Sequence, residues 1–190
     1  MASIIKVNDI QDAGGNSIIS SNGSGTFTSN LPNTGITEAD MYRMHSNESI
    51  VASVVETLDD WERPDDASFT KIGDGVSVSS GVFTFPRTGI YRVGLTVSFN
   101  ANGADSEYNQ GTIQVTKNNG GLWDDVSFST DDIKNATNSR GSITTEAIVD
   151  ITDTSNDKVR VTIFSQSNVT VIGSTNGNFT NISFIRLGDT

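Results

Sequence analysis

The stretch from Ser80 to Asn100, SGVFTFPRTGIYRVGLTVSFN, constrains the fold more than any other part of the chain. Its second half places an apolar residue at every second position: Tyr91, Val93, Leu95, Val97 and Phe99. Strict alternation of this kind predicts a β-strand with one face buried against a partner sheet. The shorter apolar run before it (Val82, Phe83, Phe85) ends at Pro86, which cannot donate a hydrogen bond to a sheet. The pattern favours a β-sandwich.

Strand patterns recur from Ile36 onward, separated by Gly, Asn and Asp turns, and no long helical pattern appears. A single short helical turn is expected at Thr37–Asp40. The other expected strands are Ile50–Val55, Phe69–Ile72, Val76–Val78, Gly111–Lys117, Trp123–Phe128, Ile143–Ile151, Val159–Ile163, Val169–Ile172 and Phe179–Leu187. About eight to ten short strands joined by such turns predict an all-β fold, an antiparallel jelly-roll sandwich.

The chain divides near residue 35 into an extended N-terminal arm, 1–35, and a sandwich domain, 36–190. The arm is rich in Gly, Asn, Ser and Thr, and Asp12–Asn16 has the composition of a hairpin turn. Ordering such a segment costs roughly 1–2 kcal/mol per residue, so we expect it to be disordered alone and to order when its strands add to a partner. The apolar residues expected to dock are Ile4, Ile5, Val7, Ile10, Ile18 and Ile19. The alternative is a tail without function.

Composition narrows the choice of partners. The 190 residues include 12 Lys and Arg against 23 Asp and Glu, a net charge of −11. Because binding to nucleic acids depends on neutralising phosphates, this balance argues against DNA or RNA partners, and equally against anionic membranes. The chain has no cysteine, which excludes disulfides and thiol chemistry. The N-terminus is too polar for a signal-peptide core or a membrane span.

The last expected strand is apolar on both faces, with Ile182 and Phe184 on one side and Ile185 and Leu187 on the other. A strand of this kind has to be covered on both sides. The sandwich core covers one face, and we expect self-association to cover the other, in an interface of roughly 2,000 Å² or more. All four residues are therefore candidates for the subunit interface. Cover by the N-terminal arm of the same chain is the alternative.

The sequence predicts no catalytic, cofactor or metal site. His45 is the only histidine, which excludes a multi-histidine metal site. The carboxylate doublets Asp59–Asp60, Asp65–Asp66, Asp124–Asp125 and Asp131–Asp132 are poor acid/base pairs, because neighbouring residues on a strand point to opposite faces unless a loop bends them together. Two alternatives stay open at this point. Loop Asp and Asn oxygens could hold calcium, and two distant carboxylates could form a glycosidase site.

The segment Phe83–Val93 resembles the F-x-x-P-x-x-G-x-Y-x-F stretch of the C1q/tumour-necrosis-factor-like jelly roll. Ala147–Val161 resembles the later strand, turn and G-D-x-V-x-V segment of that family, with Asn156–Asp157 in place of Gly-Asp. The closing strand Phe179–Leu187 falls where the C-terminal strand of the family does. The resemblance covers about residues 38–188. It implies a ten-strand jelly roll that packs as a homotrimer about a threefold axis.

Residues 2–16, ASIIKVNDIQDAGGN, are similar to the N-termini of structural proteins from tailed bacteriophages of marine bacteria and cyanobacteria. Segments like Asp60–Arg63 and endings like Phe184–Asp189 recur in the same proteins. The resemblance implies a non-enzymatic virion component, assembled in the host cytoplasm. The expected form is a homotrimeric capsid decoration (cement) protein on the outer capsid, whose arm binds the major capsid protein or another virion protein. The chain is too short for a long fibre shaft, which favours decoration over a complete tail fibre.

Three other functions remain as alternatives. The first is a tail- or head-fibre knob in which the loops Asn102–Asn109 or Asp131–Arg140 bind host surface glycans. The second is a polysaccharide-degrading enzyme, and the third is a soluble C1q-like binding module.

Overall fold

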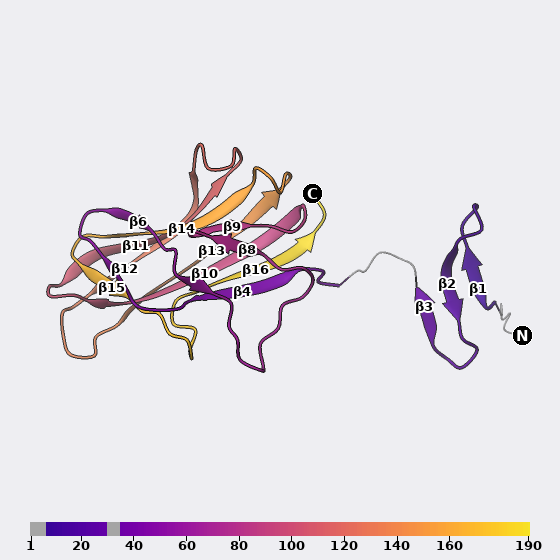
Figure 1. The fold of residues 1–190 in the computed structure, drawn as a ribbon, viewed down its shortest axis with the longest axis horizontal. Coiled ribbons are helices and arrows are strands. Elements are labelled where there is room, and N and C mark those ends of the chain that lie inside the picture. Colours follow the sequence, from indigo (N-terminus) through magenta and orange to yellow (C-terminus); the bar gives the residue numbers. More distant parts are fainter. Residues whose placement is uncertain (1–6, 30–34) are drawn as a thin grey trace, which may run out of the picture. The chain divides into compact units, whose positions relative to one another are not determined.

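The structure, a computed structural model, describes residues 7–29 and 35–190. They form two compact units, one before residue 36 and one from Ile36 to Thr190. Figure 1 shows each unit as strands joined by loops, and the described residues contain no helix. The all-β prediction is confirmed.

The N-terminal unit is a three-stranded antiparallel sheet in the order β1-β2-β3. Its strands are β1 (Asp9–Gln11), β2 (Ser17–Ser21) and β3 (Phe27–Ser29). The turn predicted at Asp12–Asn16 joins β1 to β2. The amides of Gly14 and Asn16 donate to Asp12 Oδ1 at 2.8 and 2.9 Å, and Gly15 adopts a φ of 83°, which glycine tolerates.

The sequence predicts an extended arm, whereas the described part of this segment forms a sheet of its own. Tight turns place the partner of each strand only a few residues away, so the entropy cost of closing each loop is small. Ile4 and Ile5 lie outside the described residues. The sequence reasoning recognised the hairpin turn but judged that the arm buries too little apolar area to offset the cost of ordering it.

The larger unit consists of two antiparallel sheets packed face to face (Figure 1). The β10 sheet has the order β5-β15-β10-β16-β4-β7, and β13 pairs along the other side of β10. The strands of the β10 sheet are β4 (Ala39–Met44), β5 (Glu48–Ile50), β7 (Trp61–Glu62), β10 (Gly89–Ala101), β13 (Gly141–Ile151), β15 (Val169–Val171) and β16 (Asn181–Gly188).

The β11 sheet has the order β12-β11-β14-β9-β8, and β6 also pairs with β14. The strands of the β11 sheet are β6 (Val55–Thr57), β8 (Ser77–Ser79), β9 (Val82–Thr84), β11 (Ser106–Thr116), β12 (Asp124–Ile133) and β14 (Lys158–Ser165).

The core lies between the two sheets, and β10 contributes the face that its alternation predicts. The buried hydrophobic side chains of this strand, all at most 1% exposed, are Tyr91, Val93, Leu95, Val97 and Phe99. Aromatic rings from several elements meet in the core: the Phe85 ring packs at a tilt against that of Tyr91 with centroids 4.6 Å apart, and the Phe83 ring centroid lies 5.6 Å from that of Trp61.

Three local predictions are wrong. The short helical turn expected at Thr37–Asp40 is absent, because β4 already begins at Ala39. The single strand expected at Ile50–Val55 is divided between β5 and β6 by a turn in which Ser53 has a φ of 62°. Phe69–Ile72 forms no strand, and only Ile72 makes an isolated bridge, to Ala39. At Ala39 and at Val55, pairing with strands distant in sequence overrides the local pattern.

Candidate functional site: the outer sheet face and the N-terminal unit

Strand β16 separates the four residues expected at a subunit interface into two pairs. Ile182 and Phe184 are 0% and 1% exposed, and the Phe184 ring lies 5.0 Å from that of Phe83 in the core. These two side chains have no surface to offer a second chain, so their assignment to an interface is corrected to a core role. On the opposite face, Ile185 is half-buried and Leu187 is 57% exposed.

The face of the β10 sheet that points away from the core is called here the outer β10 face. Register places Ile148 of β13, Arg92 of β10 and Ile185 of β16 in one row across it. The next row holds Glu146, Gly94 and Ser183. Ile148 is 63% exposed, which makes it one of the most exposed large apolar residues of the sandwich.

A hollow of about 280 Å³ lies over Gly94 on the outer β10 face. Its floor is polar and includes Thr96, Thr144, Asn181 and Ser183. On one side of the hollow the Arg92 guanidinium donates from Nε to Glu146 Oε2 at 2.9 Å. Because Gly94 lacks a side chain, the sheet is depressed there, next to the row that holds Ile148 and Ile185. Such a surface can receive protruding side chains of another chain.

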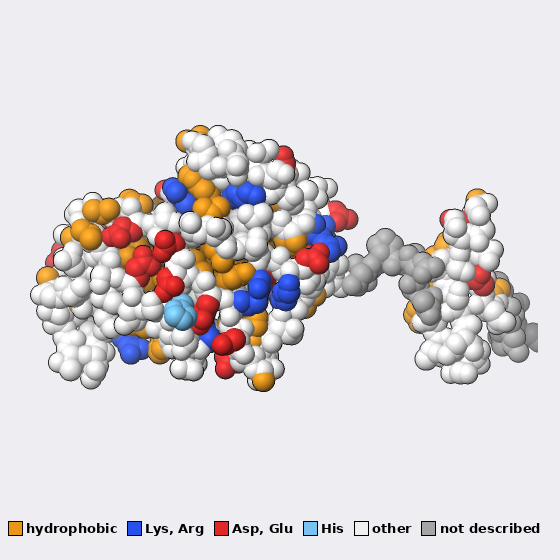
Figure 2. Space-filling view, viewed as in Figure 1, with side chains coloured by type: hydrophobic (Ala, Val, Ile, Leu, Met, Phe, Trp, Pro, Cys, Tyr) orange, Lys and Arg blue, Asp and Glu red, His pale blue; other side chains and the backbone are white. Residues whose placement is uncertain are grey.

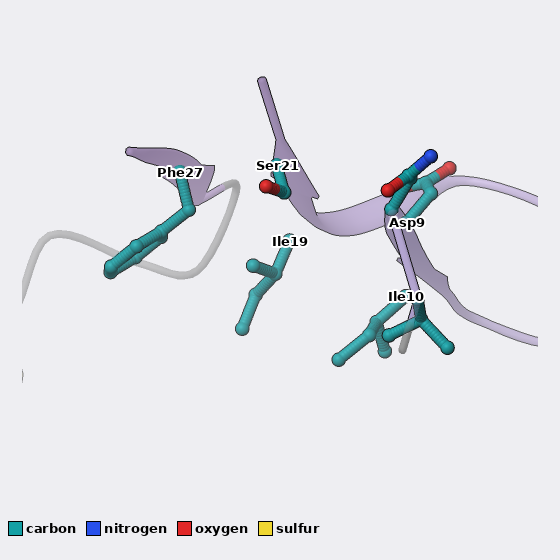
Figure 3. Close-up of a pocket in the computed structure, with 7 residues that line it drawn as sticks. Asp9, Ile10, Ile19, Ser21 and Phe27 are labelled. Carbon is teal, nitrogen blue, oxygen red and sulfur yellow. The ribbon is translucent and has the colours of Figure 1, made fainter. Parts of the chain in front are cut away.

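The N-terminal unit carries an apolar concavity of about 320 Å³ whose lining includes Ile10, Ile19 and Phe27. Figure 3 shows the side chains of Ile10 and Ile19 extending to the same side of the sheet. Ile10 is 47% exposed, Phe27 is 69% exposed, and Ile18 and Ile19 are half-buried. Val7, at 55% exposed, also lines this concavity. An apolar face of this size on so small a unit is typical of a surface that binds a partner.

Asp9 organises the polar side of the same unit. Its carboxylate accepts hydrogen bonds from Ser17 at 2.5 Å and from Ser20 at 2.9 Å, and the bond from Ser17 contributes most to lowering the pKa of Asp9. Ser17 and Ser20 of β2 are therefore engaged by β1, whereas Ser21 lines the apolar concavity together with Ile10 and Ile19.

An acidic patch surrounds the only histidine, as the red and pale-blue atoms in Figure 2 show. His45 lies with Nδ1 3.7 Å from Asp60 and Nε2 3.8 Å from Glu62. Glu48 is nearby in sequence, but its environment is set by Asp59, Glu56 and Asp60. Burial contributes most to raising the pKa of Glu48 to about 7, and these three carboxylates add to the effect. Within residues 7–29 and 35–190, no group of three or more His, Asp or Glu side chains is arranged to hold a metal ion.

Sequence reasoning missed two arginine networks that link β4 to β7 and to the residues after it. Arg43 pairs with Glu62, Asp65 and Asp66, so the segment after β7 bends one carboxylate doublet onto a single guanidinium. Arg63 binds Asp40 through two hydrogen bonds of 2.9 and 2.7 Å. The only available signal was the density of charge in Trp61–Asp66, which fits an exposed connection equally well.

The two loops considered for glycan binding lie next to each other. Lys134 Nζ is 3.1 Å from Asp105 Oδ2, and the amide of Asn135 donates to Asp105 Oδ1 at 2.7 Å. No helix in the described part of the chain is long and apolar enough to cross a membrane.

Comparisons with known proteins identify the fold. No protein-family description and no curated protein match the chain. Among solved structures, murine APRIL at pH 5.0 is similar with a TM-score of 0.55 and 15% identity, over 79% of this chain and 98% of that one. The Eiger TNF of S. frugiperda has a TM-score of 0.58 and 11% identity, over 82% and 96%. At this identity the likeness concerns the fold alone. The chain is an antiparallel, TNF-like jelly roll.

Proposed function

We propose that this protein is a non-enzymatic structural component of a tailed-phage virion, which forms a homotrimer and attaches to the particle through its N-terminal unit. The virion assignment is supported by the resemblance of residues 2–16, Asp60–Arg63 and Phe184–Asp189 to phage structural proteins. The role proposed within the virion is capsid decoration. The partner of the N-terminal unit would be the major capsid protein or another virion protein.

The observation that carries the trimer proposal is the uncovered outer β10 face. Ile185 and Leu187 keep their proposed place in the interface, and the exposed Ile148 joins them. The hollow over Gly94, which is lined by Arg92, Glu146 and polar side chains, lies beside these apolar residues on the same face. Obligate interfaces of this kind often bury roughly 2,000 Å² or more, which requires much of this face.

The N-terminal unit is the proposed docking element. Its exposed apolar residues, Val7, Ile10 and Phe27, lie on a sheet too small to provide a second layer of its own. A trimer would present three such units to one particle, so their combined avidity would exceed that of a single unit without any new contact. The short edge strands β1 and β3 also leave room for the strand addition expected from the sequence.

A fibre knob remains the second candidate, because the loops Asn102–Asn109 and Asp131–Arg140 are joined through Asp105 and form one surface. Copy number per particle separates the two roles. Quantitative mass spectrometry of purified particles should find hundreds of copies if the protein decorates the capsid. A few copies in multiples of three would support the knob, and absence from particles would contradict any virion role.

A further inference from the structure

Two neighbouring rows of uncharged side chains cross the face of the β11 sheet that points away from the core. The residues of the first row, on β12, β11, β14 and β6, are Thr130, Gln110, Phe164 and Val55. The residues of the second row, on the same strands, are Phe128, Thr112, Thr162 and Thr57. We call these eight residues, together with Tyr108, the uncharged platform. The alternate residues Ile113, Val161 and Ile163 point into the core and are fully buried.

Hydrogen bonds within the platform fix its polar groups before any ligand arrives. The Tyr108 hydroxyl donates to Gln110 Oε1, and Gln110 Nε2 donates to Thr112 Oγ1 at 2.9 Å. The Tyr108 and Phe164 rings meet edge to face, with centroids 5.9 Å apart and planes at 65°. An immobilised carboxamide therefore lies beside two aromatic rings. Ordering these side chains on binding would cost little, because most of the order is already present.

The exposed part of the platform combines apolar groups with the Tyr108 hydroxyl and the half-buried Gln110 carboxamide, whereas Thr112 and Thr162 are only 3% exposed. Tyr108 is 42% exposed, Phe128 58% and Val55 62%. A pyranose ring has the matching chemistry: its axial C–H groups pack against aromatic and aliphatic surface, while its hydroxyls donate to and accept from carboxamides and hydroxyls. We propose that the uncharged platform binds a neutral glycan. Three inter-strand spacings span roughly 14 Å, a width that accommodates two or three linked sugar rings.

Charge decides which class of glycan fits. The chain carries a net charge of −11, whereas none of the nine platform residues is charged. The overall field disfavours an anionic ligand, and nothing on the platform offsets that repulsion. The next row contains Asp125 and Arg160, but Arg160 is already engaged. Its Nε donates to Gln114 Oε1 at 2.6 Å, and its guanidinium covers the Trp123 ring at 4.3 Å. The ligand should therefore be uncharged.

This inference does not depend on the proposed trimer. The platform belongs to the β11 sheet, and the proposed subunit contacts belong to the outer β10 face, on the opposite side of the sandwich. Both surfaces can be occupied together. Tyr108 falls within the loop Asn102–Asn109, whereas the other eight platform residues lie outside the two loops that meet at Asp105.

The test uses the full chain on an array that contains neutral and anionic glycans, followed by calorimetric titration with the neutral oligosaccharide that gives the strongest signal. Tyr108→Ala and Gln110→Ala should each weaken binding at least tenfold. The matched control is Phe179→Ala, which removes an aromatic ring of similar exposure (40%) that lies over Arg140 and outside the platform. It should bind like the unaltered protein. Far-UV circular dichroism verifies folding. Tyr108→Phe removes only the hydroxyl and should weaken binding severalfold, so it replaces Tyr108→Ala in the test if the alanine variant misfolds.

Several results would overturn the proposal. One is the absence of binding to any neutral glycan, and another is binding restricted to anionic glycans. Unchanged affinity in folded platform variants would place the ligand elsewhere. If the platform variants lowered the mass of the assembly in solution instead of the glycan affinity, the face would be a contact between copies of this chain.

Discussion

Arg43 has a side chain that is only 1% exposed, and it donates a hydrogen bond from Nε to Glu62 Oε1 at 2.7 Å. Its remaining nitrogens bind Asp65 and Asp66 at 2.9 and 3.2 Å. The guanidinium thus joins strand β4 to the segment that follows β7. This connection matters for function because β4 lies next to β16 in the sheet that carries the proposed subunit interface.

Replacement of this arginine should destabilise the sandwich. Arg43→Met removes the charge that three carboxylates share, but Asp65 and Asp66 are largely exposed and can be hydrated. The loss should therefore be about 1–3 kcal/mol, below the 3–5 kcal/mol typical of a fully buried pair. Urea unfolding at pH 7 measures it. Lys134→Met, which breaks an exposed pair with Asp105, is the control and should cost about 0–1 kcal/mol. Equal losses in the two variants would contradict the account.

Glu48 should make stability depend on pH. Burial first, and then Asp59, Glu56 and Asp60, raise its pKa from 4.5 to about 7 in the folded chain. Folding therefore favours the protonated carboxyl: this contribution is fully present below pH 4.5 and is lost as the pH rises through about 7.

The amide variant isolates the effect of this group. Glu48→Gln should match the unaltered protein near pH 4 and exceed its stability at pH 8, by on the order of 1–2 kcal/mol. Thermal unfolding between pH 4 and pH 8 checks this, with Glu107→Gln, at an exposed site, as the control. A stability difference between Glu48→Gln and the unaltered chain that stays constant with pH would refute it.

Substitutions of Phe184 and Ile185, which face opposite sides of β16, should have different effects: the first on folding and the second on assembly. Phe184 packs against Phe83 and Phe85 in the core, so Phe184→Ala should destabilise the sandwich by about 3–5 kcal/mol. Phe184→Asp should prevent folding and cause aggregation. Chemical denaturation of the alanine variant measures the loss. A stable Phe184→Asp protein that merely loses its partners would show that this side chain belongs to an interface.

Ile185 faces away from the core, so Ile185→Asp should keep the fold and dissociate the trimer. Gly94→Leu should have the same effect by filling the hollow on the outer β10 face; a Cβ there would lie 3.0 Å from the Ser183 hydroxyl, which can rotate away. Multi-angle light scattering measures the mass. Val51→Asp, in an exposed turn outside this face, should remain trimeric. Intact trimers in both interface variants would disprove the proposed contact surface.

Removal of residues 1–30 tests the docking element separately. The truncated protein should keep its sandwich, because that unit has its own core, and should remain a trimer. It should no longer bind the particle. Sedimentation with particles, compared with the full chain at the same concentration, measures binding. Full occupancy by the truncated protein would exclude the N-terminal unit as the docking element.

The sequence predicted those parts of the fold in which local pattern and tertiary environment agree. The alternation from Tyr91 to Phe99 became the central strand, and Asp12–Asn16 became a turn, because period and turn chemistry are local properties. The roles of Ile182 and Phe184 could not be read from sequence, because a strand that is apolar on both faces does not reveal which face meets the core. The arginine networks depend on side chains that are 19 to 23 residues apart, such as Arg43 and Asp65, and no local pattern indicates them.

The mass of the full chain in solution tests the central claim most directly. Sedimentation equilibrium at micromolar concentration should give about three times the 20.2 kDa of one chain. A single-chain mass under the same conditions, with the sandwich folded, would contradict the proposal that the outer β10 face is covered by self-association.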